Sequence, residues 1–126
     1  MATLTPTLTL ASTNALSDTL NLSVTDTLTT TNPSEFSRIS VSHSGNGTIL
    51  YADSGAVAYV YIKNIGTNSR TIDIRTANAS GAGTAYAQLA PGEFAFFPWA
   101  STVDLFADAA TGTPSLEVRV FEVAIS

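Results

Sequence analysis

From residue 36 onward the chain is a series of short segments in which apolar and polar residues alternate. Examples are VAYVYIK at 57–63 and LEVRVFEVAI at 116–125, and clusters of Gly, Pro, Asn or Asp separate most segments. Period-two alternation is typical of strands with one buried face, and many short strands between turn signals predict a sandwich or barrel. No window has a helical period of useful length. We therefore predict an all-β antiparallel β-sandwich of about eight strands over residues 36–126.

Residues 1–35 are biased toward Thr, Ser and Leu and are predicted to form an extended N-terminal arm with edge strands. Leu4, Leu8 and Leu10 share one parity in TLTPTLTL, and Pro6 confines this segment to an edge because it cannot donate to a ladder. Residues 19–29 are predicted to be a true strand. We expect the three leucines to enter a surface of another protein chain. The alternatives are a low-complexity linker, or a segment that folds back on its own sandwich.

The composition favours a protein in which much of the surface contacts other protein chains. Of the 126 residues only 12% are charged, about half the usual share, and 44% are hydrophobic. A surface so poor in charge must be covered by Thr, Ser, Asn and Ala. We therefore expect an oligomer, and the absence of Cys rules out a disulfide framework.

The charge balance excludes several classes of partner. The net charge is −5, the pI is about 4.4, and no basic residue precedes Arg38. Nucleic-acid binding needs a basic footprint, so we expect none. The apolar runs are too short to span a bilayer, and MATLTPTLTL has neither the basic start nor the apolar centre of a secretory signal. We expect no membrane association and no signal peptide.

No arrangement of residues points to catalysis, a metal or a cofactor. The single histidine, His43, lies in the glycine-rich stretch SHSGNG, and its flanking serines would point away from it on a strand. One histidine cannot anchor a zinc site, and Asp104 and Asp108 would lie ~13 Å apart along a strand, too far for one calcium ion. We predict no enzyme activity and no cofactor.

The segments VAYVYIK and RTIDIRT (70–76) are predicted to form one hairpin. Its inward residues would be Val60, Ile62, Ile72 and Ile74. The nearest register that keeps these on one face sets Tyr59 opposite Arg75 and Tyr61 opposite Asp73. The outer face is then either a solvated surface or a subunit contact, since Tyr and Arg are enriched in interface cores.

The stretch LAPGEFAFFPW at 89–99 predicts a turn followed by a strand with large rings on both faces. Pro91 and Gly92 fit the central positions of a type II turn. We assign Phe94 and Phe96 to the core, together with Val118 and Val120. Phe97 and Trp99 have the opposite parity and would be covered by a loop, by the N-terminal segment or by a neighbouring chain. They join the candidate interface, which comprises Leu4, Leu8, Leu10, Tyr59, Tyr61, Arg75, Phe97 and Trp99.

Three stretches together resemble small virion structural proteins of tailed bacteriophages, especially capsid decoration or cement proteins. They are the strand and turn at 61–66, LAPGEFAFFP at 89–98, and the ending VDLFADAATGTPSLEVRVFE at 103–122. The resemblance covers roughly residues 49–126 and leaves the arm outside. It implies a jelly-roll-like sandwich, often a homotrimer, that sits on the capsid surface where major capsid proteins meet. It also implies no enzyme activity, no cofactor, and synthesis in the host cytoplasm before incorporation into the virion.

Two other functions fit the same residues. A phage tail, fibre or head-tail connector component would have a similar β-sandwich fold. A carbohydrate-binding module would instead use exposed rings such as Tyr59, Tyr61 or Trp99 to stack on sugars.

Overall fold

The chain folds into twelve β-strands within the residues that the structure, a computed structural model, describes. These are residues 2–31, 35–42, 47–52, 57–67, 71–76, 85–99 and 103–123. The strands are β1 (Ala2–Leu4), β2 (Thr7–Ser12), β3 (Leu20–Thr25), β4 (Leu28–Thr30), β5 (Glu35–Ser40), β6 (Thr48–Tyr51), β7 (Ala58–Asn64), β8 (Ile72–Arg75), β9 (Ala85–Leu89), β10 (Phe94–Trp99), β11 (Leu105–Ala109) and β12 (Ser115–Glu122). His43 lies outside the described residues. Among those described, there is no helix long and apolar enough to cross a membrane.

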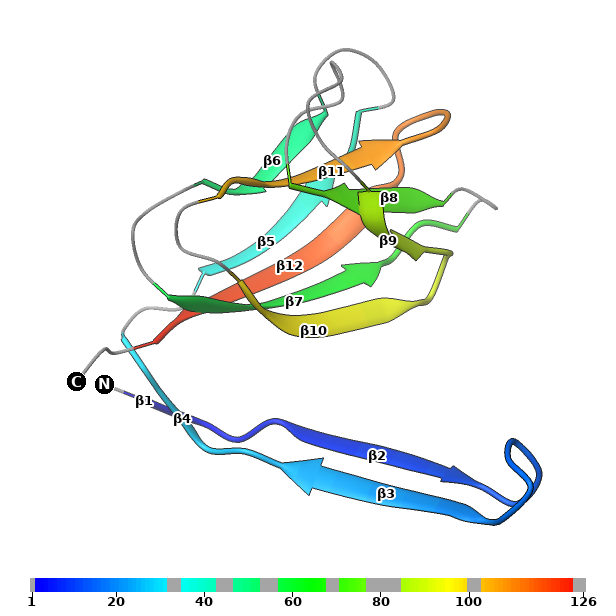
Figure 1. The fold of residues 1–126 in the computed structure, drawn as a ribbon. Helices are drawn as coiled ribbons and strands as arrows, with labels where there is room; N and C mark the ends of the chain where they lie inside the picture. Colours follow the sequence, from blue (N-terminus) through cyan, green and yellow to red (C-terminus); the bar gives the residue numbers. More distant parts are fainter. Residues whose placement is uncertain are drawn as a thin grey trace.

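Eight strands, β5 to β12, form a sandwich of two four-stranded antiparallel sheets (Figure 1). One sheet has the order β10-β7-β12-β5 and the other β6-β11-β8-β9. The pairs β5–β12, β6–β11, β7–β10 and β8–β9 are nested one inside the next along the chain. A long hairpin wrapped into two sheets in this way is a jelly roll. The prediction of an antiparallel, jelly-roll-like sandwich of about eight strands with an N-terminal arm is therefore confirmed.

The predicted hairpin of β7 with β8 is wrong, because these strands belong to different sheets. β7 pairs with β10 and β12, whereas β8 pairs with β11 and β9. Tyr59 therefore does not face Arg75, and Tyr61 does not face Asp73. The reason is that the connection after β7 crosses from one sheet to the other, as a jelly roll requires. The predicted inward residues fill the core from both sides.

The core lies between the two sheets and is built from alternating inward side chains. Val60, Ile62, Ile72 and Ile74 are fully buried, and Val118 and Val120 are 2% and 3% exposed, as predicted. The buried cluster contains Val41, Leu50, Tyr51, Ala58, Val60, Ile62, Ile72, Ile74, Leu89, Leu105, Ala107, Ala109, Leu116, Val118 and Val120. Each fully buried aliphatic side chain contributes roughly 1.5–3 kcal/mol to stability.

Strand β10 faces the opposite way from the prediction. Phe94 and Phe96 point outward and are 63% and 38% exposed, while Phe97 and Trp99 pack against the core. The register with β7 decides this, because Phe97 lies opposite the buried Val60 and Phe96 opposite the outward Tyr61. The indole of Trp99 also finds a partner there, donating to the carbonyl of Val103 at 2.7 Å.

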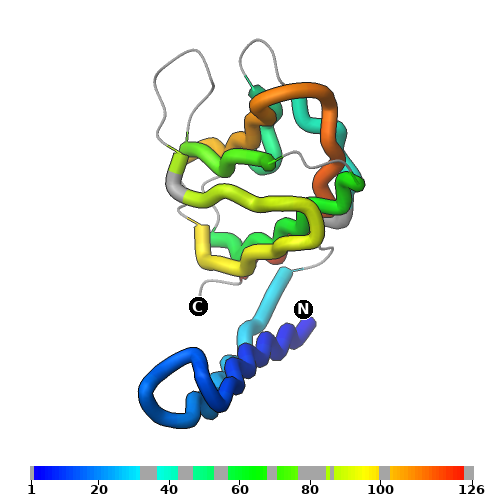
Figure 2. Tube along the Cα trace, turned by 90° about the vertical axis from the view of Figure 1, so that its right-hand side faces the viewer, coloured from blue at the N-terminus to red at the C-terminus, as the bar shows by residue number. Residues whose placement is uncertain are grey.

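Residues 2–31 form the arm, which stands clear of the sandwich (Figures 1 and 2). β2 and β3 pair over six residues each in one long hairpin, and β1 pairs with β4 at its base. Pro6 falls in the break between β1 and β2, where no ladder bond is required. The predicted strand at 19–29 is likewise divided, into β3 and β4.

The buried amide of Asn64 joins the end of β7 to the turn before β10. Its Nδ2 donates to the carbonyl of Leu89 at 2.9 Å, and its Oδ1 accepts from the Gly66 amide at 2.9 Å. The turn itself has the predicted form: Gly92 has a φ of 88°, and the Glu93 amide donates to the Ala90 carbonyl at 3.0 Å. Asn64 thus ties the end of β7 in one sheet to the end of β9 in the other.

We expect Ile62→Ala to lower the free energy of unfolding by roughly 2–5 kcal/mol, because the cavity at a fully buried site cannot collapse completely. The matched control is Ile49→Ala, since Ile49 is 50% exposed on the other sheet. Urea unfolding of the two variants measures the difference. Equal losses would contradict this assignment of the core.

Replacing Asn64 by Ala should cost about 1–3 kcal/mol, because a buried carbonyl and a partly buried amide each lose their partner. The control is Asn21→Ala on the exposed arm, where no such loss is expected. Thermal unfolding of both variants is the measurement, and an Asn64→Ala protein as stable as the parent would show that Asn64 holds nothing in place.

Candidate functional site

The arm carries an apolar face that is exposed to solvent. Cross-strand pairing sets Leu8 opposite Val24 and Leu10 opposite Leu22, so the four side chains share one face of the hairpin. They are 49%, 52%, 43% and 39% exposed in that order. We call these four residues the arm face. Thr and Ser occupy most of the opposite face, and the hydroxyls of Thr7 and Thr25 hydrogen-bond there at 3.1 Å.

A second apolar surface covers the outer side of the β10-β7-β12-β5 sheet. We call it the aromatic face, and it consists of Tyr59, Tyr61, Phe94, Phe96 and Phe121. Tyr59 stacks on Phe96 with ring centroids 5.7 Å apart, and Tyr61 lies 6.4 Å from Phe94 in a tilted pair. The guanidinium of Arg119 lies 5.9 Å from the centroid of the Tyr61 ring.

Leu8 and Val24 of the arm face and the five rings of the aromatic face line an open groove of about 510 Å³. Leu4, Pro6, Leu8 and Val24 form one wall, and the rings of the aromatic face form the other. Figure 1 shows β2 and β3 running alongside β10 and β7, the strands that carry most of the aromatic face. Large apolar surfaces that remain in water on a single chain mark interaction sites.

The two walls of the groove differ in charge. The arm wall carries Asp26, and residues 2–31 contain no Lys or Arg. The sheet wall carries Arg119, and Lys63 and Arg38 lie on the same side of that sheet at positions opposite Glu117. Glu117 lies 3.7 Å from Arg119 and 4.0 Å from Arg38.

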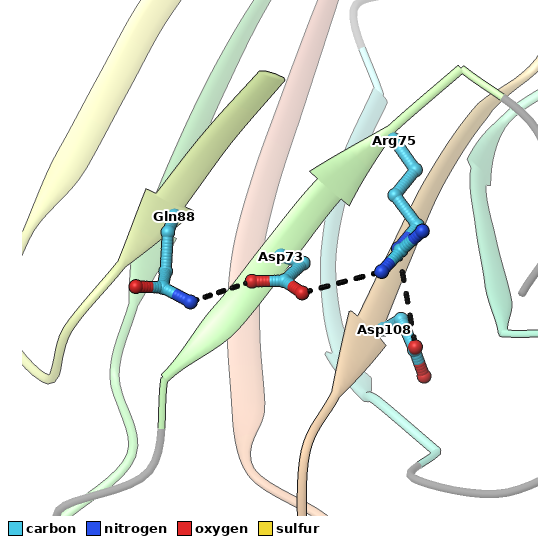
Figure 3. A network of polar contacts seen from close by, with 4 residues as sticks. All are labelled: Asp73, Arg75, Gln88 and Asp108. Atoms are coloured by element: carbon cyan, nitrogen blue, oxygen red, sulfur yellow. Dashed lines mark hydrogen bonds and ion pairs between the residues drawn. The ribbon is translucent and has the colours of Figure 1, made fainter. Parts of the chain in front are cut away.

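Arg75 lies on the outer side of the other sheet, in the polar network that Figure 3 shows. Its guanidinium is 3.4 Å from Asp73 and 3.9 Å from Asp108. Gln88 donates to Asp73 at 2.8 Å. These links cross β9, β8 and β11, so they tie the three strands together on a half-buried surface.

The structure brings together only part of the predicted interface. Leu4, Leu8, Tyr59 and Tyr61 line the groove, and Leu10 lies farther along the same arm face. Arg75 lies on the other sheet, and Phe97 and Trp99 pack inward.

Sequence reasoning missed several groove residues, which are Val24, Phe94, Phe96, Arg119 and Phe121. The alternation of LEVRVFE does place Arg119 and Phe121 on one face of their strand. What the sequence lacked was the pairing that sets this face beside Tyr59 and Tyr61.

The site offers apolar and aromatic surface rather than reactive groups. Within the described ranges, no three His, Cys, Asp or Glu side chains gather in a way that could hold a metal ion. Compared with protein-family models, curated proteins and solved structures, the chain has no significant match.

We expect Phe97→Ala to destabilise the protein toward the lower end of the roughly 3–5 kcal/mol seen for buried rings, because Phe97 packs against the core. Phe94→Ala is the matched control on the same strand and should cost much less, since Phe94 is 63% exposed. Denaturant titration of both proteins compares the two losses. A larger loss for Phe94→Ala would reverse the assigned faces of β10.

Proposed function

We propose that this chain is a non-enzymatic structural protein of a tailed-bacteriophage virion. Its role would be that of a capsid decoration or cement protein, bound on the capsid surface between major capsid proteins as a homotrimer. The observation that carries the proposal is the exposed arm face opposite the aromatic face on a jelly-roll sandwich. The sequence resemblance at 49–126 supports this family, and jelly rolls are common in viral capsid proteins.

A decoration protein acts by binding the assembled lattice in preference to free capsid subunits. Binding to one state alone shifts the equilibrium toward that state by mass action. The surface needed for this is apolar, accessible and poor in charge. The arm face meets these requirements, since its four residues are 39–52% exposed and only 12% of the chain is charged.

A carbohydrate-binding module is the second candidate, and the exposed rings Phe94 and Phe96 beside Tyr59 and Tyr61 favour it. Sugars stack on the free face of an aromatic ring. Here Tyr59 and Phe96 already stack on each other at 5.7 Å, with an angle of 24° between the rings, so each has one face occupied. Calorimetric titration against a panel of glycans distinguishes this function, because a decoration protein gives no heat of binding with them.

Particles of the phage that encodes this chain should contain it at a copy number comparable to that of the major capsid protein. Quantitative mass spectrometry of purified particles gives this ratio. Particles prepared without the protein should lose their contents at a lower temperature, and adding the purified protein back should restore the parent value. A few copies per particle would assign the chain to the tail, a fibre or the connector, and absence from the particle would overturn the proposal.

A further inference from the structure

The sheet side of the groove changes from apolar to charged along its strands. Residues that pair across strands share a face of the sheet. The register gives three outward rows across β10, β7 and β12: Phe94, Lys63 and Glu117; then Phe96, Tyr61 and Arg119; then Pro98, Tyr59 and Phe121. Successive rows are ~7 Å apart, because each strand residue rises about 3.3 Å, so the three rows span ~13 Å. An occupant that lies along the strands therefore meets apolar surface at one end and charge at the other.

This outer face of the sheet is positively charged, although the net charge of the chain is −5. Among the paired outward positions of its four strands, the basic residues are Lys63, Arg119 and Arg38, and Glu117 is the one carboxylate. Three cations against one carboxylate leave a charge of +2. The side chain of Arg119 is 49% exposed and lines the groove. Since a guanidinium has five N–H donors, Arg119 can bind an anionic group in addition to its contact with Glu117.

The backbone beneath the groove offers little to a polar occupant. β7 is paired with β10 and β12, and β12 is paired with β7 and β5, so the two middle strands use their backbone groups within the sheet. A peptide or a sugar lying on this face would leave many amides or hydroxyls without partners, which is costly. An alkyl chain carries no such groups. The volume of about 510 Å³ also falls within the roughly 300–1,000 Å³ of small-molecule sites.

We propose that the groove binds single molecules of a linear amphiphile with an anionic head, such as an alkyl carboxylate. The tail lies between Leu8 and Val24 on the arm and the rings of the aromatic face. The carboxylate binds Arg119, with Lys63 one row farther along β7, in the paired geometry that arginine and carboxylates favour. Asp26 on the arm wall repels the head and so keeps it on the sheet side. This inference goes beyond the proposed function, because the site needs neither a capsid nor a second copy.

NMR titration of the full chain with hexanoate, octanoate and decanoate tests the site, each kept below the concentration at which micelles form. We expect shifts in amides of both the arm and the sheet, and a dissociation constant that falls by up to about fourfold for each CH₂ group buried. Decyltrimethylammonium has a tail of similar length and a cationic head. It should bind at least tenfold more weakly than decanoate, because Arg119 repels it. Equal or tighter binding of this cation would overturn the proposal, and so would decanoate that shifts neither wall.

Variants then show whether decanoate binds in the groove or is only attracted to a basic surface. Arg119→Gln should raise its dissociation constant by about tenfold, as expected for a lost hydrogen bond to a charged group. Arg38→Gln is the matched control, since it makes the same change of charge on the same face at a side chain that is 69% exposed and outside the lining of the groove. It should change the dissociation constant less than twofold. Equal losses in the two variants would mean general attraction and would overturn the proposal.

The apolar wall has its own pair of variants. Phe96→Ala should weaken decanoate binding severalfold, because part of the tail loses its contact surface. Ile49→Ala, which lies on the other sheet and is 50% exposed, should leave it unchanged. A Phe96→Ala protein that binds decanoate like the parent would overturn the proposal. The copy number in particles is measured without any amphiphile, so this inference and the proposed function can fail separately.

Discussion

The pairing of β7 with both β10 and β12 is the constraint on which the rest of the structure depends. β7 alternates strictly between buried and half-buried residues, so its register fixes the two faces of its neighbours. Val60 and Ile62 point into the core and draw Phe97 inward with them. Tyr61 points outward and brings Phe96 and Arg119 beside it. The register of β7 with its neighbours therefore buries the core residues and also places the aromatic face on the outer side of the sheet.

The base of the arm sets how much apolar surface this protein leaves in water. A single β-bridge and a short hydrogen bond hold β4 against the end of β12, so the hairpin stays apart from the sheet. A hairpin without this attachment could collapse onto the aromatic face and bury both surfaces in one chain. The attachment thus leaves both apolar surfaces exposed on a single chain.

Much of the fold could be predicted from the sequence, because period-two alternation and turn residues are local signals. The buried residues of β7, β8 and β12 and the turn at Pro91-Gly92 followed from them. Strand pairing is not local, and so the hairpin of β7 with β8 was wrong. Alternation shows which residues of a strand share a face but not which of the two faces is buried. Since β10 has rings on both faces, its buried face was predicted wrongly. The aromatic face was missed for the same reason.

In the proposed function, self-association as a homotrimer and binding to a capsid lattice would be physically connected. The homotrimer proposed above would present three identical lattice-binding surfaces at fixed spacing. Once one surface binds, the others meet their sites at a high effective concentration, provided that the spacing of the sites matches. An assembled shell offers matched sites, and free capsid subunits do not. Weak individual contacts, which suit a surface with few charges, would then suffice for selective binding to the shell.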